Sequence, residues 1–84
     1  MPTVRFTQHL RRLAPPPGDV PGETVRAALD AVFDGHPMLA SYILDDQRRL
    51  RRHIALFVDG AKAGLDDAVG PAADIAVLQA LSGG

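Results

Sequence analysis

Apolar and polar residues alternate in two parts of the chain, and a period of two predicts β-strands. Residues 3–10 carry apolar side chains at nearly every second position. Residues 50–58 return to this pattern, with three aliphatic side chains on one face and Ala55 and Phe57 on the other. The dipeptide Asp-Gly at 59–60 then predicts a tight turn.

A period near 3.6 appears after Thr24, which is a good helix N-cap. Apolar side chains then recur three and four positions apart and form one stripe. They are Val25, Ala28, Leu29, Val32 and Phe33. Gly35 suits the position after the last turn, and Pro37 suits the first turn of a short second helix over 37–44. The pattern predicts one main amphipathic helix whose stripe packs into the core.

The remaining segments predict little regular structure. Residues 14–22 are rich in Pro and Gly, so any second strand there is expected to be short and at a sheet edge. Residues 61–73 are small, acidic and interrupted by Gly and Pro, which predicts at most a helical turn over 65–69. The order of elements predicts an α+β domain in which a small mixed sheet carries one main helix on one face.

The last predicted strand leads directly into Gly83–Gly84. Residues 75–81 are apolar apart from Gln79, which predicts a buried strand. Because Gly has no Cβ, an extended Gly-Gly tail can enter a slot that is too narrow for other residues. Its carboxylate is ionised at neutral pH and could attack the α-phosphate of ATP to give an acyl-adenylate. A frayed terminus or a cloning scar would explain the same glycines without chemistry.

Composition removes several other classes of function. The 84 residues include 46% hydrophobic residues and a net charge of −1, which is ordinary for one small domain and argues against a general polyanion binder. Cys is absent, which excludes disulfides, thiolate metal sites and Cys nucleophiles. No apolar run approaches the roughly 20 residues that span a bilayer, and no signal peptide opens the chain, so we expect a cytoplasmic protein.

The polar residues predict no catalytic centre of the chain's own. The three histidines lack the spacing of a metal site, and adjacent carboxylates do not point at one another. P-loop, GxGxxG and GxSxG motifs are absent. The charge cluster over 48–53 is either a patch for phosphate or an acidic partner, or a solvated turn balanced by Asp45 and Asp46. Nucleic acid is disfavoured because no aromatic residues are interleaved.

Taken together, these segments resemble the MoaD/ThiS family of ubiquitin-like sulfur carriers, which adopt the β-grasp fold. The resemblance covers nearly the whole chain and is most specific at Gly83–Gly84. The matching segments are residues 4–6 with 10–13, 22–25 with 36–37, 53–60, and 75–84. The sequence departs from the family pattern at Asp59, where the family often has Asn, and at Ala73, where it commonly has Gly. The prolines at 15–17 weaken the second strand.

The resemblance implies a single domain over residues 1–84 with a flexible tail over 82–84. The chain would be a carrier and not an enzyme. A separate adenylating enzyme of the ubiquitin-activating type would use ATP and Mg²⁺ to activate Gly84, and a persulfide would supply the sulfur of a Gly84 thiocarboxylate. Ser82 and Gly83 would thread through the partner's active site, and Leu78 and Leu81 would help to dock the partner.

By the same resemblance, a downstream biosynthetic enzyme would receive the sulfur. The chain could then be the small subunit of a synthase in molybdenum cofactor biosynthesis, although thiamin, cysteine and sulfur-containing secondary metabolites are served by similar carriers. Two other classes stay open: a modifier whose Gly84 forms isopeptides with lysines, and a β-grasp interaction module whose tail is never activated. None of these readings involves nucleic acid, a membrane or a metal bound by the chain.

Overall fold

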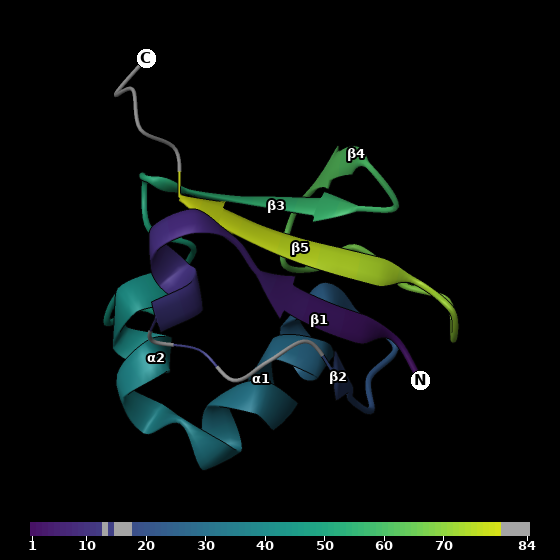
Figure 1. Ribbon diagram of the computed structural model, residues 1–84, viewed down its shortest axis with the longest axis horizontal. Helices are drawn as coiled ribbons and strands as arrows, with labels where there is room; N and C mark the ends of the chain where they lie inside the picture. The colour runs from purple at the N-terminus through teal and green to yellow at the C-terminus, as the bar shows by residue number, and fades with distance from the viewer. Residues whose placement is uncertain (13, 15–17, 80–84) are drawn as a thin grey trace.

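A computed structural model describes residues 1–12, 14 and 18–79 (Figure 1). The domain boundary at 84 and the expected tail over 82–84 therefore lie outside the described residues. The elements follow one another as β1 (Thr3–Phe6), the 3-10 helix η1 (Gln8–Arg12), β2 (Gly18–Asp19), α1 (Val25–Gly35), α2 (Pro37–Ile43), β3 (Ile54–Val58), β4 (Ala61–Ala63) and β5 (Asp74–Gln79).

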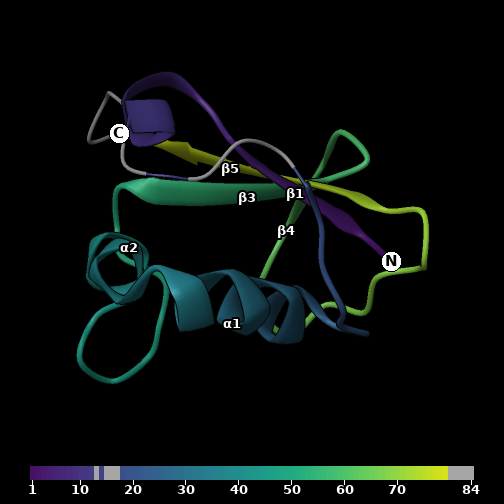
Figure 2. The ribbon, with the colours of Figure 1, turned by 60° about the horizontal axis from the view of Figure 1, so that its bottom comes forward.

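The strands form one mixed sheet in the order β2-β1-β5-β3-β4. The last strand in sequence, β5, is central: it runs parallel to β1 and antiparallel to β3. Both α-helices lie on one face of this sheet (Figure 2). The predicted α+β architecture, a mixed sheet with one main helix on one face, is confirmed.

The core lies between α1 and the inner face of the sheet. All five residues of the α1 stripe are buried, and they meet inward-facing residues of the central strands such as Leu56, Ile75 and Val77, which have no exposed surface. Full burial of one such aliphatic side chain stabilises the fold by about 1.5–3 kcal/mol. The apolar stripe of α1 and the inward-facing side chains of β3 and β5 therefore pack against each other in one core.

The start of α1 is fixed by its cap. The Thr24 Oγ1 accepts a hydrogen bond from the Ala27 N–H at 3.1 Å, as the sequence predicts. At the other end, Gly35 is the last helical residue, and His36 takes the capping position expected for Gly35. Pro37 then occupies the first turn of α2, as predicted.

The expected first strand is too long, because β1 ends at Phe6 and the chain then turns into η1. The alternation fails at the polar Gln8, and a 3-10 turn brings Leu10 into the core by another route. The β3 strand likewise begins at Ile54, four residues later than the pattern predicts. Leu50 instead makes an isolated bridge with Leu44.

The structure also contains a strand that the sequence pattern does not predict. Asp59 and Gly60 have φ values of 51° and 86°, which is the geometry of a tight hairpin turn, and β4 folds back along β3. The β4 residues Ala61 and Lys62 are exposed, so they carry no alternation of apolar side chains. The expected short edge strand is present as β2, which spans two residues beside β1.

Candidate functional site

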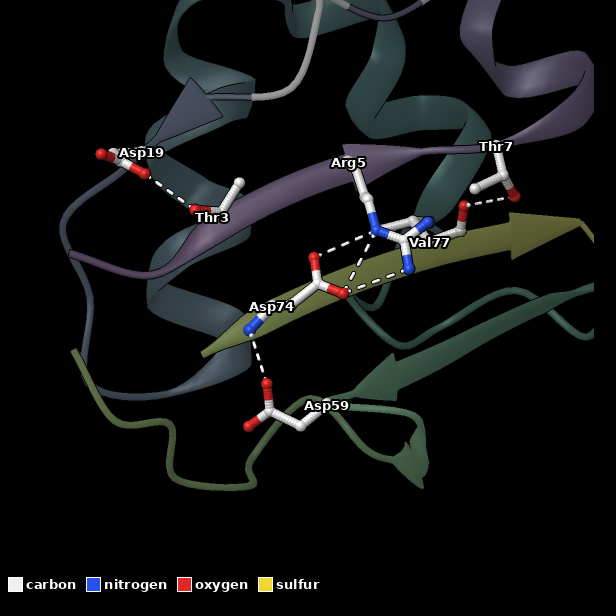
Figure 3. A network of polar contacts seen from close by, with 7 residues as sticks. All are labelled: Thr3, Arg5, Thr7, Asp19, Asp59, Asp74 and Val77. Atoms are coloured by element: carbon white, nitrogen blue, oxygen red, sulfur yellow. Dashed lines mark hydrogen bonds and ion pairs between the residues drawn. The ribbon is translucent and has the colours of Figure 1, made fainter. Parts of the chain in front are cut away.

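The candidate site is the end of the sheet where β5 finishes, called here the Gln79 end. Gln79 lies opposite Ile54 on β3, so β5 stops where β3 starts. On the other side, the Thr7 N–H donates to the Val77 carbonyl at 3.1 Å, and the Thr7 Oγ1 donates to the same oxygen at 3.4 Å (Figure 3). The strand that precedes Gly83–Gly84 in the sequence is therefore held on both sides.

Four of the five predicted tail and docking residues cannot be placed. Leu81, Ser82, Gly83 and Gly84 lie outside the described residues. Their roles therefore stay predictions, and Leu78 is the predicted site residue that the structure positions.

Leu78 lies on the sheet face that points away from the helices, since Val77 beside it faces the core. Its strand register places it beside Ala55, and Ala76 lies beside Phe57. Ala55, Phe57 and Leu78 are half-buried, whereas Ala76 is buried beneath its neighbours. We call these four apolar residues of β3 and β5 the outer patch. The sequence already placed Ala55 and Phe57 on one face, but the partners across the sheet were missed because strand pairing is not local in sequence.

The opposite end of β5 is closed by polar contacts (Figure 3). Asp74 accepts hydrogen bonds from the Arg5 guanidinium at 3.0–3.2 Å, and these bonds raise the pKa of Arg5 above its ordinary value. The Asp74 N–H donates to the Asp59 Oδ1 at 3.0 Å. Thr3 on β1 donates its hydroxyl to Asp19 on β2. These contacts tie β1, β2, the β3–β4 turn and β5 together at this end of the sheet, called the Asp74 end.

The predicted charge cluster over 48–53 lies on the connection from α2 to β3. Asp45 organises it by accepting hydrogen bonds from the backbone N–H groups of Arg49 and Gln47, both at 2.9 Å. The bond from Arg49 is the main reason that the pKa of Asp45 lies below its ordinary value. Arg48 pairs with Asp30 of α1 at 2.7 Å. A surface hollow of about 480 Å³ is lined by Asp45, Arg49, Leu50, Arg51, Arg52 and His53.

The described residues offer no cluster of three or more His, Asp or Glu side chains that could hold a metal ion. The adjacent carboxylates are engaged in turns, since the Asp67 side chain accepts from the Gly64 N–H at 2.7 Å. Within the described ranges, no helix has the length and apolar character that a bilayer crossing requires. The Gln79 end thus provides a β5 strand paired on both sides, and the sequence continues from it to Gly83–Gly84.

Comparison with known proteins identifies relatives of the same size. The chain is 37% identical over 67 residues to Small archaeal modifier protein 1 of Haloferax volcanii, a match that covers 79% of this chain and 77% of the relative. The crystal structure of SAMP1 from Haloferax volcanii superposes with a TM-score of 0.82 at 31% identity, over 99% of this chain and 98% of that one.

A chain of the Amycolatopsis orientalis BexX/CysO complex has the same fold, with a TM-score of 0.84 at 23% identity over the full length of both chains. No family model matches the sequence. The SAMP1 likeness, in sequence and in structure, nevertheless extends over most of both chains. The chain therefore belongs to the MoaD/ThiS family of ubiquitin-like sulfur carriers and has their β-grasp fold.

Proposed function

We propose that the chain is a sulfur carrier whose Gly84 carboxylate is activated by a partner enzyme of the ubiquitin-activating type. The observation that carries this proposal is the place of Gly83–Gly84 in the sequence, separated by three residues from the end of the central strand β5 of a member of this family. A strand hydrogen-bonded on both sides gives the following residues a fixed starting point, and two glycines add no side-chain bulk.

The proposed chemistry belongs to the partner enzyme, which uses ATP and Mg²⁺. A Gly84 carboxylate oxygen attacks the α-phosphate, and pyrophosphate leaves. The outer sulfur of a persulfide then attacks the acyl carbon of the adenylate and displaces AMP, which gives an acyl disulfide. A second thiolate then attacks the donor's own sulfur in this acyl disulfide. A new disulfide forms with the donor, and the Gly84 thiocarboxylate leaves. Ser82 and Gly83 are proposed to pass through the partner's active site during these steps.

Docking of the partner is assigned to the outer patch together with Leu81. Leu78 is half-buried on the sheet face that the helices leave uncovered, and Phe57 lies close to it on β3. Aromatic side chains such as that of Phe57 are enriched at protein interfaces, and the interface core is more apolar than the rest of the surface. The BexX/CysO complex supports the expectation that a chain of this fold pairs with a protein partner.

The decisive experiment is the intact mass of the protein after incubation with the host's adenylating enzyme, ATP, Mg²⁺ and a persulfide donor. A gain equal to the mass difference between sulfur and oxygen is expected, and a variant that lacks Gly84 should show no gain. An unshifted wild-type mass under these conditions would rule out the carrier proposal. Deletion of Gly83 and Gly84 without loss of biological activity would instead support an interaction module.

A protein modifier is the second candidate, because the relative from Haloferax volcanii is named a modifier. Both candidates require activation of Gly84, but in a modifier the acyl group passes to a lysine amine. Conjugates of higher mass that form in lysate with the wild-type chain, and not with the Gly84 deletion, would identify this use.

The recipient of the sulfur is proposed to be a molybdopterin-type synthase, with this chain as its small subunit. Mixing the thiocarboxylated protein with the purified large subunit and its pterin precursor tests this assignment. Formation of the dithiolene product is the expected outcome. Its absence, together with transfer to another biosynthetic enzyme, would redirect the assignment to that pathway. The cytoplasmic location also stays a prediction.

A further inference from the structure

Charged residues are sorted between the two ends of the sheet. Six of the ten acidic residues lie at the Asp74 end or on the loops that adjoin it, as their contacts with β1, β5 and the start of α1 show. These residues are Asp19, Glu23, Asp59, Asp66, Asp67 and Asp74. Two of the cations at this end, Arg5 and Arg26, are held in ion pairs with Asp74 and Asp66.

The Gln79 end carries four arginines. Arg11 and Arg12 belong to η1, which follows β1 and contacts β5. Arg51 and Arg52 lie in the turn before β3, which begins at Ile54. Ile54 is the residue that pairs with Gln79 on β5. Figure 1 shows η1 and the start of β3 at the same end of the sheet. The two arginine pairs therefore flank the end of β5 from the β1 side and from the β3 side.

These four arginines differ in their pairing from the other arginines, Arg5, Arg26, Arg48 and Arg49, each of which pairs with an aspartate. Arg11, Arg12 and Arg52 are exposed, and none of the four makes an ion pair within 4.0 Å with another described side chain. Arg51 is half-buried and donates through Nε to the Ser41 carbonyl at 2.7 Å, which is a neutral acceptor. The nearby Asp45 binds the backbone of its own turn. Asp45 shares a surface hollow with Arg51 and Arg52 and partly offsets the charge of Arg51, whereas the exposed guanidinium groups of Arg11, Arg12 and Arg52 are left available for a partner.

The backbone beneath Arg51 and Arg52 is held in place. The Arg51 N–H donates to the Ile43 carbonyl at the end of α2, and the Arg51 carbonyl accepts from the Ile54 N–H, both at 3.0 Å. A fixed backbone reduces the entropy cost of placing a guanidinium against a carboxylate. Arginine also suits this position because it stays protonated, can bind a carboxylate with two parallel hydrogen bonds, and presents no amine to an activated carboxyl group.

We propose that the Gln79 end is an electrostatic docking surface for a protein partner whose tail-binding channel is rimmed by Asp and Glu. This inference rests on the proposed function, because the partner is the enzyme that receives Gly84. The four arginines meet the acidic rim, while the acidic Asp74 end points away from it, so the charge distribution orients the domain during encounter. Nucleic acid fits less well, since the chain has a net charge of −1 and six acidic residues at the other end.

The test compares charge reversals at the two ends of the sheet. Arg11→Glu and Arg52→Glu are made singly and together, and Lys62→Glu on the exposed edge strand β4 is the control with the same change in charge. Arg52→Lys preserves the charge. The readout is pyrophosphate release by the host's adenylating enzyme with each variant as substrate, at low and moderate salt. Circular dichroism and unfolding midpoints establish that each variant is folded, and Arg52→Gln replaces any reversal that fails to fold.

Each reversal at the Gln79 end is expected to lower kcat/KM by about tenfold at low salt, chiefly through KM. The double variant should also lose most of the salt dependence that the wild type shows. Lys62→Glu should stay close to wild type, and Arg52→Lys, which keeps the charge but cannot make two parallel hydrogen bonds, should lose much less than Arg52→Glu.

Two results would overturn this inference and leave the proposed function intact. In the first, the wild type is activated but the arginine reversals lower kcat/KM no more than Lys62→Glu does. In the second, an oligonucleotide binds in a salt-sensitive manner and competes with the enzyme. A wild-type chain that is never activated would overturn the proposed function and, with it, this inference.

Discussion

Asp59 and Asp74 exchange two hydrogen bonds where the β3–β4 turn meets the start of β5. The Asp59 N–H donates to the Asp74 carbonyl at 2.9 Å. The Asp74 N–H donates to the Asp59 side chain at 3.0 Å, the bond drawn in Figure 3. Asp59 does this from a left-handed conformation with a φ of 51°. Asp59 therefore forms the turn after β3 and also holds the first residue of β5 through its side chain.

Replacing Asp59 by Ala is expected to lower the free energy of unfolding by about 1–2 kcal/mol, because the variant loses the side-chain acceptor and tolerates positive φ less well. Asp59→Asn keeps an acceptor oxygen and tolerates the same backbone, so it should stay within about 0.5 kcal/mol of wild type. Urea unfolding of the three proteins measures both differences. Equal losses in the two variants would show that the side-chain hydrogen bond contributes nothing.

Gly22 lets the chain before α1 pass close to the helix. A Cβ at this position would lie 2.6 Å from the backbone nitrogen of Ala28 and 2.9 Å from its Cα, and the φ of Gly22 is 150°. Because the obstacle is helix backbone, Gly22→Ala is expected to destabilise the fold by about 1–3 kcal/mol. Gly35→Ala is the matched control: its Cβ meets no atom within 4 Å, so stability should be unchanged or higher by up to about 1 kcal/mol. Thermal unfolding followed by circular dichroism compares the two, and a Gly22→Ala variant as stable as the control would contradict the close approach.

Leu56 lies in the core between the sheet and the helices, and none of its surface is exposed. Leu56→Ala should lower the free energy of unfolding by about 2–5 kcal/mol, since it removes buried methyl groups and leaves a cavity. Phe57 follows in the same strand but faces outward, so Phe57→Leu should cost much less stability. Urea denaturation compares the two losses of stability. A larger loss for Phe57→Leu than for Leu56→Ala would mean that the inner and outer faces of β3 are assigned wrongly.

The carboxyl group of Asp45 is expected to make the free energy of unfolding depend on pH. Its pKa is lowered in the folded protein, chiefly by the Arg49 N–H, so the native state favours the charged carboxylate. The stabilising contribution is fully present above the ordinary pKa of 3.8 and is lost as the pH falls through the lower folded value. Asp45→Asn has no carboxylate to titrate and should lose less stability than wild type over that acidic range. Urea midpoints measured from neutral to acidic pH test this, and parallel curves for the two proteins would exclude Asp45 as a contributor.

Leu78 tests the docking role of the outer patch. Leu78→Asp places a charge among Ala55, Phe57 and Ala76, so the affinity for the adenylating enzyme should fall by about tenfold or more. Ala61→Asp introduces the same charge at an exposed position on edge strand β4 and should leave the affinity within about twofold. Titration calorimetry with the purified enzyme gives both values. An unchanged affinity for a folded Leu78→Asp variant would remove Leu78 from the interface.

The sequence by itself determined the elements whose signal is local. The stripe from Val25 to Phe33, the Thr24 cap and the Asp59–Gly60 turn each depend on neighbours within a few residues, and the structure confirms all three. The apolar run before Gly83–Gly84 predicted a buried strand, and β5 lies there with Ile75, Ala76 and Val77 buried; that this strand is central was not predicted.

Only the tertiary structure decided which distant residues lie together. Strand β4 has exposed residues and exists because a hairpin turn pairs it with β3, while Leu10 reaches the core from a 3-10 turn that the alternation does not encode. The outer patch and the sorting of charge between the Gln79 and Asp74 ends arise from the pairing of β5 with β1 and β3, across separations of about 20 to 70 residues. Local patterns fix the elements, but contacts between distant segments depend on how the whole chain closes around one core.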